Sequence, residues 1–95
     1  MKEEINKRLQ RALRHAPWHA RHAIAENEDP ALLWEELCTI VVDTLDEADL
    51  HGFETPVEFT NKVCRALNDA VMHAYEESIW ERVELAIQET VEKEL

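Results

Sequence analysis

The sequence predicts a small all-α protein, a single domain built from about four helical segments. Its 95 residues are 45% hydrophobic and 33% charged, which is the composition of one globular domain. Only one glycine and three prolines occur, so the chain has few of the turns that a sheet requires. Apolar residues recur at spacings of three and four along most of the chain, as in amphipathic helices.

Residues 1–25 form the first predicted segment, a basic amphipathic helix. Ile5, Leu9 and Leu13 lie four residues apart and make one apolar stripe. Pro17 removes a backbone donor inside this segment, so we expect a kink, or a short break with Pro17 at the first position of a second short helix.

The central helix is predicted over residues 30–51. Asp29 followed by Pro30 is typical of a helix start, with a carboxylate cap before a proline at the first helical position. Gly52 is the residue type favoured just past a helix end. The apolar side chains of this segment cover an arc of roughly 200°, so we expect the helix to contact more than one neighbour.

A single long helix is predicted over residues 56–95. Thr55, Pro56 and Glu58 form a capping box with proline at the first position, and no glycine or proline follows. The apolar stripe of the second half is rotated by roughly 180° from that of the first, and the change falls near residues 72–78. Either the helix bends or breaks there, or its second half packs on a partner subunit, and the dimer is the favoured interpretation. The expected dimer or partner stripe is Ile79, Trp80, Val83, Ile87 and Val91.

Charge divides the chain into a basic first part and a strongly acidic remainder. The formal net charge is −11, yet residues 1–25 have a balance of +4, against −15 for residues 26–95. The acidic remainder, residues 26–95, repels nucleic acid and membrane phosphates and attracts basic surfaces. We therefore expect no direct nucleic-acid binding, no membrane binding, and a basic protein partner.

Carboxylates recur on the outer faces of the central and last helices. Helical spacing places them ~5–6 Å apart, close to the interval between phosphates on a nucleic-acid strand. Any soluble helix has a charged outer face, but few lysines or arginines compensate these rows, and that arrangement costs stability. The predicted partner-binding residues are Glu35, Glu36, Asp43, Asp46, Glu47, Glu77, Glu81, Glu84, Glu89 and Glu92.

The segment from Thr55 to Leu95 resembles the C-terminal part of the Ocr family of phage anti-restriction proteins, which imitate DNA. The residues that carry the resemblance are Thr60, Val63, Arg65, Leu67, Trp80, Glu81, Glu84, Glu89 and Glu92. The resemblance implies an elongated, dimeric, all-α phage protein that occupies the DNA groove of a restriction enzyme in the host cytoplasm. The basic first segment and the lack of a long acidic tail depart from the family, which leaves a CRISPR effector open as the target.

Two other functions remain open at this stage. A helical adaptor or dimerisation module would use the second apolar stripe as its working surface. An all-α, magnesium-dependent nucleotide pyrophosphohydrolase would need carboxylates on facing helices, but the expected paired motifs and a basic cluster for the phosphates are missing. Its site would be Glu35, Glu36, Asp43, Glu81 and Glu84.

The remaining reactive residues do not indicate an enzyme, and we expect no catalytic residue, cofactor or metal. Ser78 is the only serine and has no evident His/Asp partner in the sequence. His15, His19 and His22 share one helical side, but Pro17 would distort a metal site there, so we expect surface histidines.

The cellular compartment of the protein is predicted from its cysteines and from the hydropathy of the chain. Cys38 and Cys64 lie in helical patterns and fit a reducing cytoplasm better than a disulfide scaffold. No N-terminal apolar stretch and no long apolar run occur, so we expect neither a signal peptide nor a membrane span.

Overall fold

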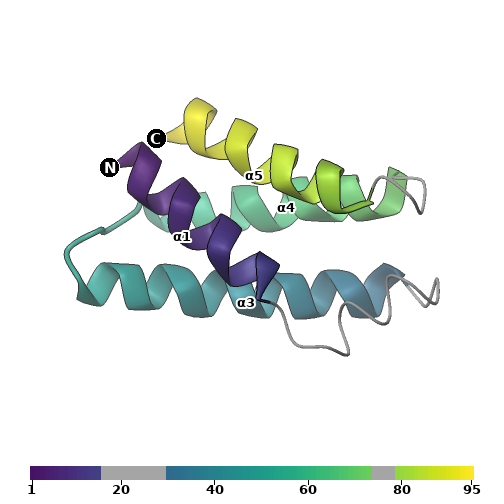
Figure 1. Cartoon of the computed structure of the whole chain (residues 1–95), viewed down its shortest axis with the longest axis horizontal. Helices are drawn as coiled ribbons and strands as arrows, with labels where there is room; N and C mark the ends of the chain where they lie inside the picture. The colour runs from purple at the N-terminus through teal and green to yellow at the C-terminus, as the bar shows by residue number, and fades with distance from the viewer. Residues whose placement is uncertain (16–29, 74–78) are drawn as a thin grey trace.

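The computed structural model describes residues 1–15, 30–73 and 79–95. These residues form four helices, which confirms the prediction of a small all-α bundle (Figure 1). The helices are α1 (Lys2–Arg14), α3 (Pro30–Leu50), α4 (Val57–His73) and α5 (Ile79–Glu94).

The helices are arranged as the four corners of a bundle. The main packing contacts join α1 to α3, α3 to α4, α4 to α5, and α5 back to α1. Consequently α3 and α5 lie at opposite corners, as do α1 and α4, and Figure 1 shows α1 in front with α4 behind it. This diagonal relation decides which charged faces can form one surface.

The core fills the centre of the bundle and takes residues from all four helices. Within the described part of the chain every buried side chain is apolar, and none is polar or charged. The spacing of three and four predicted from the sequence is the spacing of these buried positions, because one face of each helix points inward. The core residues are Ile5, Leu9, Leu13, Leu33, Leu37, Val41, Leu45, Ala48, Phe59, Val63, Leu67, Val71, Val83, Ile87 and Val91.

The end of α3 is set by Gly52, whose φ of 88° is in the left-handed region. The amide of Gly52 donates to the carbonyl of Asp49 at 3.1 Å, and the amide of Phe53 donates to the carbonyl of Ala48 at 2.9 Å. This pair of hydrogen bonds is the Schellman motif, which satisfies the last carbonyls of a helix. Helix α3 therefore ends at Leu50, one residue before the boundary expected from the sequence.

The structure corrects the prediction of one long helix over residues 56–95. Two helices, α4 and α5, occupy this stretch, and they pack against each other side by side (Figure 1). A continuous helix could not bring its two halves into contact. Because the chain folds back, the two differently oriented stripes both face the same core, and neither needs a partner subunit. The expected change of stripe at residues 72–78 falls largely on residues 74–78, which lie outside the described part.

Candidate functional site: an acidic ridge on α3

Helix α3 carries six carboxylates and no lysine or arginine. Five of the six are exposed and Glu36 is half-buried, because the opposite side of the helix faces the core. We call this surface the α3 ridge. It consists of Glu35, Glu36, Asp43, Asp46, Glu47 and Asp49.

The charge density of the α3 ridge is close to that of a nucleic-acid strand. From Glu35 to Asp49 the helix rises by about 21 Å at ~1.5 Å per residue. The six carboxylates are separated on average by roughly 4.2 Å of helix axis, against ~3.4 Å between phosphates along one DNA strand. Asp49 belongs to the ridge although it was missing from the sequence-based set. Its position three residues after Asp46 is the signal that could have found it.

The placement of the carboxylates along α3 opposes the helix dipole. The first turn contains no acidic residue and the last turn contains no basic one, while Asp46, Glu47 and Asp49 lie near the C-terminal end. A helix favours acidic residues at its start and basic residues at its end, so this order is destabilising. Stability alone would not select such a pattern, which favours a role in binding.

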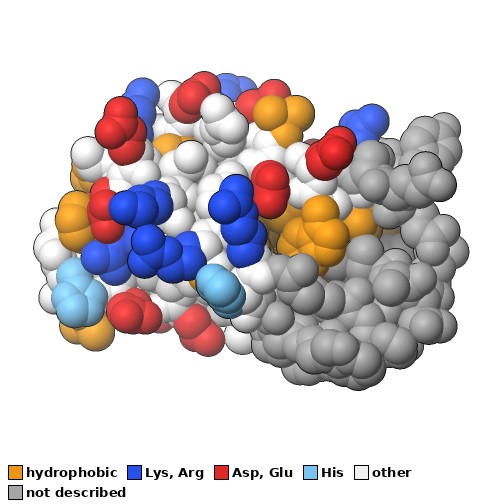
Figure 2. All heavy atoms as spheres, in the orientation of Figure 1, with side chains coloured by type: hydrophobic (Ala, Val, Ile, Leu, Met, Phe, Trp, Pro, Cys, Tyr) orange, Lys and Arg blue, Asp and Glu red, His pale blue; other side chains and the backbone are white. Residues whose placement is uncertain are grey.

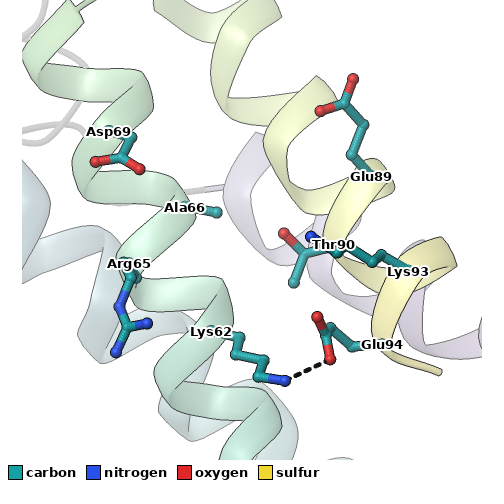
Figure 3. A pocket seen from close by; sticks show the side chains of 8 residues that line it. All are labelled: Lys62, Arg65, Ala66, Asp69, Glu89, Thr90, Lys93 and Glu94. Atoms are coloured by element: carbon teal, nitrogen blue, oxygen red, sulfur yellow. Dashed lines mark hydrogen bonds and ion pairs between the residues drawn. The ribbon is translucent and has the colours of Figure 1, made fainter.

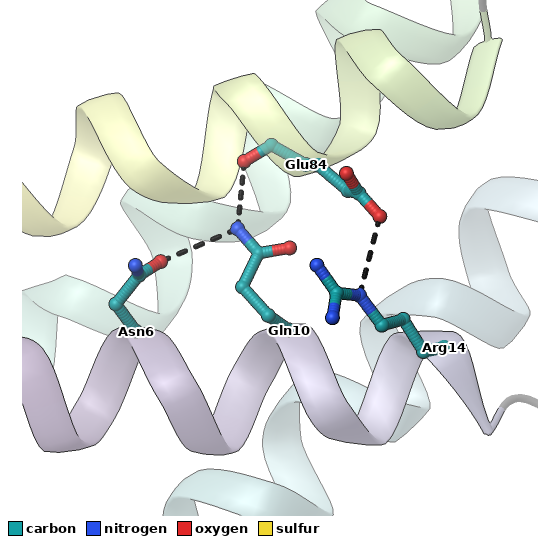
Figure 4. Close-up of polar contacts among 4 residues, drawn as sticks. All are labelled: Asn6, Gln10, Arg14 and Glu84. Carbon is teal, nitrogen blue, oxygen red and sulfur yellow. Dashed lines mark hydrogen bonds and ion pairs between the residues drawn. The ribbon is translucent and has the colours of Figure 1, made fainter.

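The acidic row on α5, unlike the α3 ridge, has basic residues on its own helix. Arg82 and Lys93 lie on the same helix. Glu84 also meets α1, because its Oε1 lies 3.5 Å from Nε of Arg14, and its carbonyl accepts a hydrogen bond of 2.8 Å from Nε2 of Gln10 (Figure 4). Glu81, Glu89 and Glu92 are exposed on α5, and Glu77 lies outside the described residues.

The two predicted acidic rows do not form one surface. Helices α3 and α5 occupy opposite corners, with the basic helix α1 between them on one side and α4 on the other. Since α4 carries two acidic and two basic residues, it does not link the rows electrostatically. Of the two rows, we therefore take the α3 ridge as the candidate site.

The apolar stripe expected to face a partner is part of the chain's own core, which corrects that expectation. Val83, Ile87 and Val91 are almost fully buried between α5 and its neighbours. Ile79 and Trp80 are half-buried and pack against the same core. The reason is the fold-back of α5 onto α4 and α1, which covers the stripe within one chain.

The basic residues of α1 partly contact the acidic remainder of the same chain. Lys2 donates through Nζ to the carbonyl of Glu92 at 3.0 Å, and Arg14 approaches Glu84. Arg8 pairs with Glu4 at 2.9 Å and lies over the ring of Phe53. Figure 2 shows lysine and arginine side chains gathered over α1, next to acidic side chains. The side chains of Lys7 and Arg11 are exposed.

No metal centre is formed by the described residues. In the described parts of the chain, no three His, Cys, Asp or Glu side chains are close enough to hold a metal ion. The carboxylates of a supposed pyrophosphohydrolase site are not brought together either, because α3 and α5 are diagonal neighbours. His15 is exposed, while His19, His22, Trp18 and Arg21 lie outside the described residues.

Cys38 and Cys64 lie at the interface of α3 and α4 as free, half-buried thiols. Burial, together with a hydrogen bond to Cys64, raises the pKa of the Cys38 thiol to about 12. Trp34 donates from Nε1 to the carbonyl of Cys64 at 2.8 Å and so joins the two helices. A thiol with such a pKa is protonated at neutral pH and is a poor nucleophile.

Comparison with known proteins found no matching family model, no matching curated protein and no matching solved structure. None of the described helices combines the length and the hydropathy that a membrane crossing requires.

Proposed function

We propose that this protein is a non-catalytic, acidic inhibitor that binds the DNA-binding groove of a host defence enzyme, of the restriction or CRISPR type, and excludes DNA from it. The α3 ridge is the contact surface. One observation carries the proposal: six carboxylates without a single basic residue line a helix at close to the charge density of a DNA strand.

The mechanism is competition for a basic groove. A groove that binds duplex DNA attracts the ridge by the same long-range electrostatics that attract phosphates, and it releases bound counterions in the same way. No bond is made or broken by the inhibitor. Both association and affinity should therefore weaken steeply with salt, as they do for DNA itself.

The contact surface differs from the one that the Ocr resemblance would imply. That resemblance covers α4 and α5, where Trp80 packs against the core and Glu84 is engaged by α1. The proposal rests on α3 instead. The adaptor alternative depended on the stripe of α5, whose central residues are buried, so no specific observation now favours it. A homodimer is proposed separately, through a different face that is described in the next subsection.

A competition assay with matched charge reversals tests the proposal. Asp43→Lys and Asp46→Lys together change the α3 ridge, and Glu81→Lys and Glu92→Lys make the same change of charge on α5. All four positions are exposed, so both variants should retain their helical content by circular dichroism. DNA binding and cleavage by a type I restriction enzyme and by a Cas9 ribonucleoprotein are then measured over a series of salt concentrations.

We expect the wild-type protein to inhibit at least one enzyme, with a potency that falls as salt rises. The α3 variant should lose tenfold or more of this potency, whereas the α5 variant should stay within a few-fold of wild type. Equal losses for both variants, or inhibition that does not respond to salt, would contradict a role for the α3 ridge.

A further inference from the structure

The four basic residues of the acidic part of the chain all line one groove. Residues 26–95 contain nineteen acidic residues but only four lysines or arginines, Lys62, Arg65, Arg82 and Lys93. All four border the groove between α4 and α5, on the outside of the bundle, and Figure 3 shows three of them, Lys62, Arg65 and Lys93. A random scatter of the basic residues over this acidic surface would not gather them at one helix pair.

The floor of this groove is made of small side chains. Ala66 and Ala70 come from α4, and Ala86 and Thr90 from α5. In Figure 3 Ala66 and Thr90 point into the gap between the two helices. Because these side chains are short, the groove stays open, with a volume of about 550 Å³ at the end near Lys62 and Glu94. Short side chains let a second protein surface approach the helices closely.

The groove is lined by charges of both signs. Its acidic residues are Asp69, Glu89 and Glu94, so this face is almost neutral, whereas α3 is purely acidic. Lys62 and Glu94 already pair within the chain at 2.7 Å. In the described part of the chain, Arg65, Asp69 and Glu89 make no ion pair of their own and remain available for one across an interface.

We propose that this groove is the face through which a second copy of the chain docks, with α4 and α5 of each copy meeting those of the other. A two-fold interface requires a surface that is complementary to itself. A face with charges of both signs satisfies this requirement, because a two-fold rotation can place basic positions of one copy opposite acidic positions of the other. A chain of net charge −11 repels its own copies elsewhere, above all along α3.

The size of the face indicates a weak, concentration-dependent dimer. Helices of 17 and 16 residues extend for about 25 Å, and two packed helices are roughly 20 Å wide. Such a face, on the order of 500 Å², is smaller than the ~800 Å² per partner of a standard specific interface and is in the range of weak, transient ones. Leu85, 52% exposed at the rim of the groove, adds an apolar contact.

The proposal does not depend on the function proposed for α3. Helix α3 packs beside α4 and is not part of the groove, so each copy in the dimer keeps its ridge accessible. Failure of the inhibition assay would leave this dimer untouched, and failure of the dimer would leave a monomeric inhibitor.

Two oppositely charged variants test the interface, and they work for either orientation of the two-fold axis. One replaces Arg65 and Arg82 by glutamate (Arg65→Glu and Arg82→Glu), and the other replaces Asp69 and Glu89 by lysine (Asp69→Lys and Glu89→Lys). The four residues are exposed, so circular dichroism should show an intact bundle in both. Molar mass is measured by analytical ultracentrifugation up to high micromolar concentrations, for each protein alone and for their equimolar mixture. Asp43→Lys with Asp46→Lys on α3 is the control.

We expect the wild type and the α3 control to dimerise, and each groove variant alone to weaken self-association at least tenfold. Mixing the two groove variants should restore a dimer, which repulsion within one chain cannot explain. A wild type that stays monomeric, groove variants that dimerise as well as wild type, or a mixture that stays monomeric would each overturn the proposal. Binding of a polyglutamate peptide to a monomeric wild type would instead assign the groove to an acidic segment of another protein, and it too would overturn the dimer.

Discussion

Nε of Arg14 on α1 lies 3.5 Å from Oε1 of Glu84 on α5. This contact is at the interface between the basic first helix and the acidic remainder of the chain. Gln10, one turn earlier, donates from Nε2 to the backbone carbonyl of the same glutamate. The row of carboxylates on α5 is therefore used in part to hold α1 in the bundle. The α3 ridge has no basic residue on its own helix, so the two acidic rows should respond oppositely to charge reversal.

Reversal of Glu84 should destabilise the bundle. Glu84→Lys replaces an attraction to Arg14 by a repulsion, and both side chains are largely solvated, so the cost should be at most about 1 kcal/mol. Urea denaturation followed by circular dichroism measures it. Glu81→Lys, three residues earlier on α5, is the matched control. An equal effect at both positions would show that the contact with Arg14 contributes nothing.

Reversal of Asp46 should stabilise the bundle while weakening the proposed inhibition. Asp46→Lys places a cation three residues from both Asp43 and Asp49 on an exposed face and relieves their mutual repulsion. At ~0.2–0.5 kcal/mol per helical pair, we expect a gain of about 0.5–1 kcal/mol in urea denaturation. A stability gain accompanied by lost inhibition is the behaviour of a charge kept for function. A loss of stability on this substitution would speak against the repulsive ridge.

Ile87→Asp should unfold the protein rather than only detach a partner. Ile87 is fully buried, and a carboxylate there would have neither water nor a counter-charge. We expect helical circular dichroism to be largely lost at room temperature. Ile87→Val serves as the control and should cost only about 0.5–1.5 kcal/mol. A folded Ile87→Asp variant would mean that α5 does not pack as described.

Gly52→Ala should lower stability by about 1 kcal/mol, because the φ of 88° is strained for any residue with a Cβ. An added Cβ would meet nothing within 4 Å, so the cost is confined to the backbone. Gly52→Asn should cost less, since asparagine tolerates this region better. Thermal unfolding measures the loss of stability in each variant. Equal losses for Gly52→Ala and Gly52→Asn would indicate a steric cause and not a backbone cause.

The Cys38 thiol should make the protein less stable at alkaline pH. Its pKa is raised from 9.0 to about 12, chiefly by burial, so the folded state holds the proton more tightly than the unfolded state. The stabilisation is complete below pH 9.0 and is lost as the pH rises toward about 12. Cys38→Ala should flatten the fall of Tm over this range. An unchanged slope would contradict the raised pKa.

The raised pKa of the Cys38 thiol also predicts that it reacts slowly with thiol reagents. At pH 8 the folded protein should contain far less Cys38 thiolate than a thiol of ordinary pKa, because burial raises the pKa of this thiol. Alkylation by iodoacetamide, read out residue by residue by mass spectrometry, should be far slower in the native protein than in urea. Equal rates in the two conditions would contradict the burial of this thiol.

Much of the fold could be predicted because local signals agree with it. Helix α3 begins at Pro30, where the sequence predicted its start, and Gly52 lies just past its end, since both residue types act through the local backbone. The inward positions on each helix follow from periodicity alone. At the junction of α4 and α5 the rotated stripe left a break and a partner-covered helix both open, because neither glycine nor proline lies between His73 and Ile79 to decide between them. Without a local breaker, only packing distinguishes one long helix from two short ones.

The amino-acid order by itself determined the helical class, the buried faces and the acidic character of residues 26–95, because each depends on residue type and spacing along the chain. Only the tertiary structure decided which other parts of the chain those faces contact. It buried the stripe of α5 in the chain's own core, engaged Glu84 with Arg14, and separated the α3 ridge from the α5 row. The physical reason is that helix order around the bundle arises from packing between distant segments. Periodicity within any one helix carries no information about its neighbours.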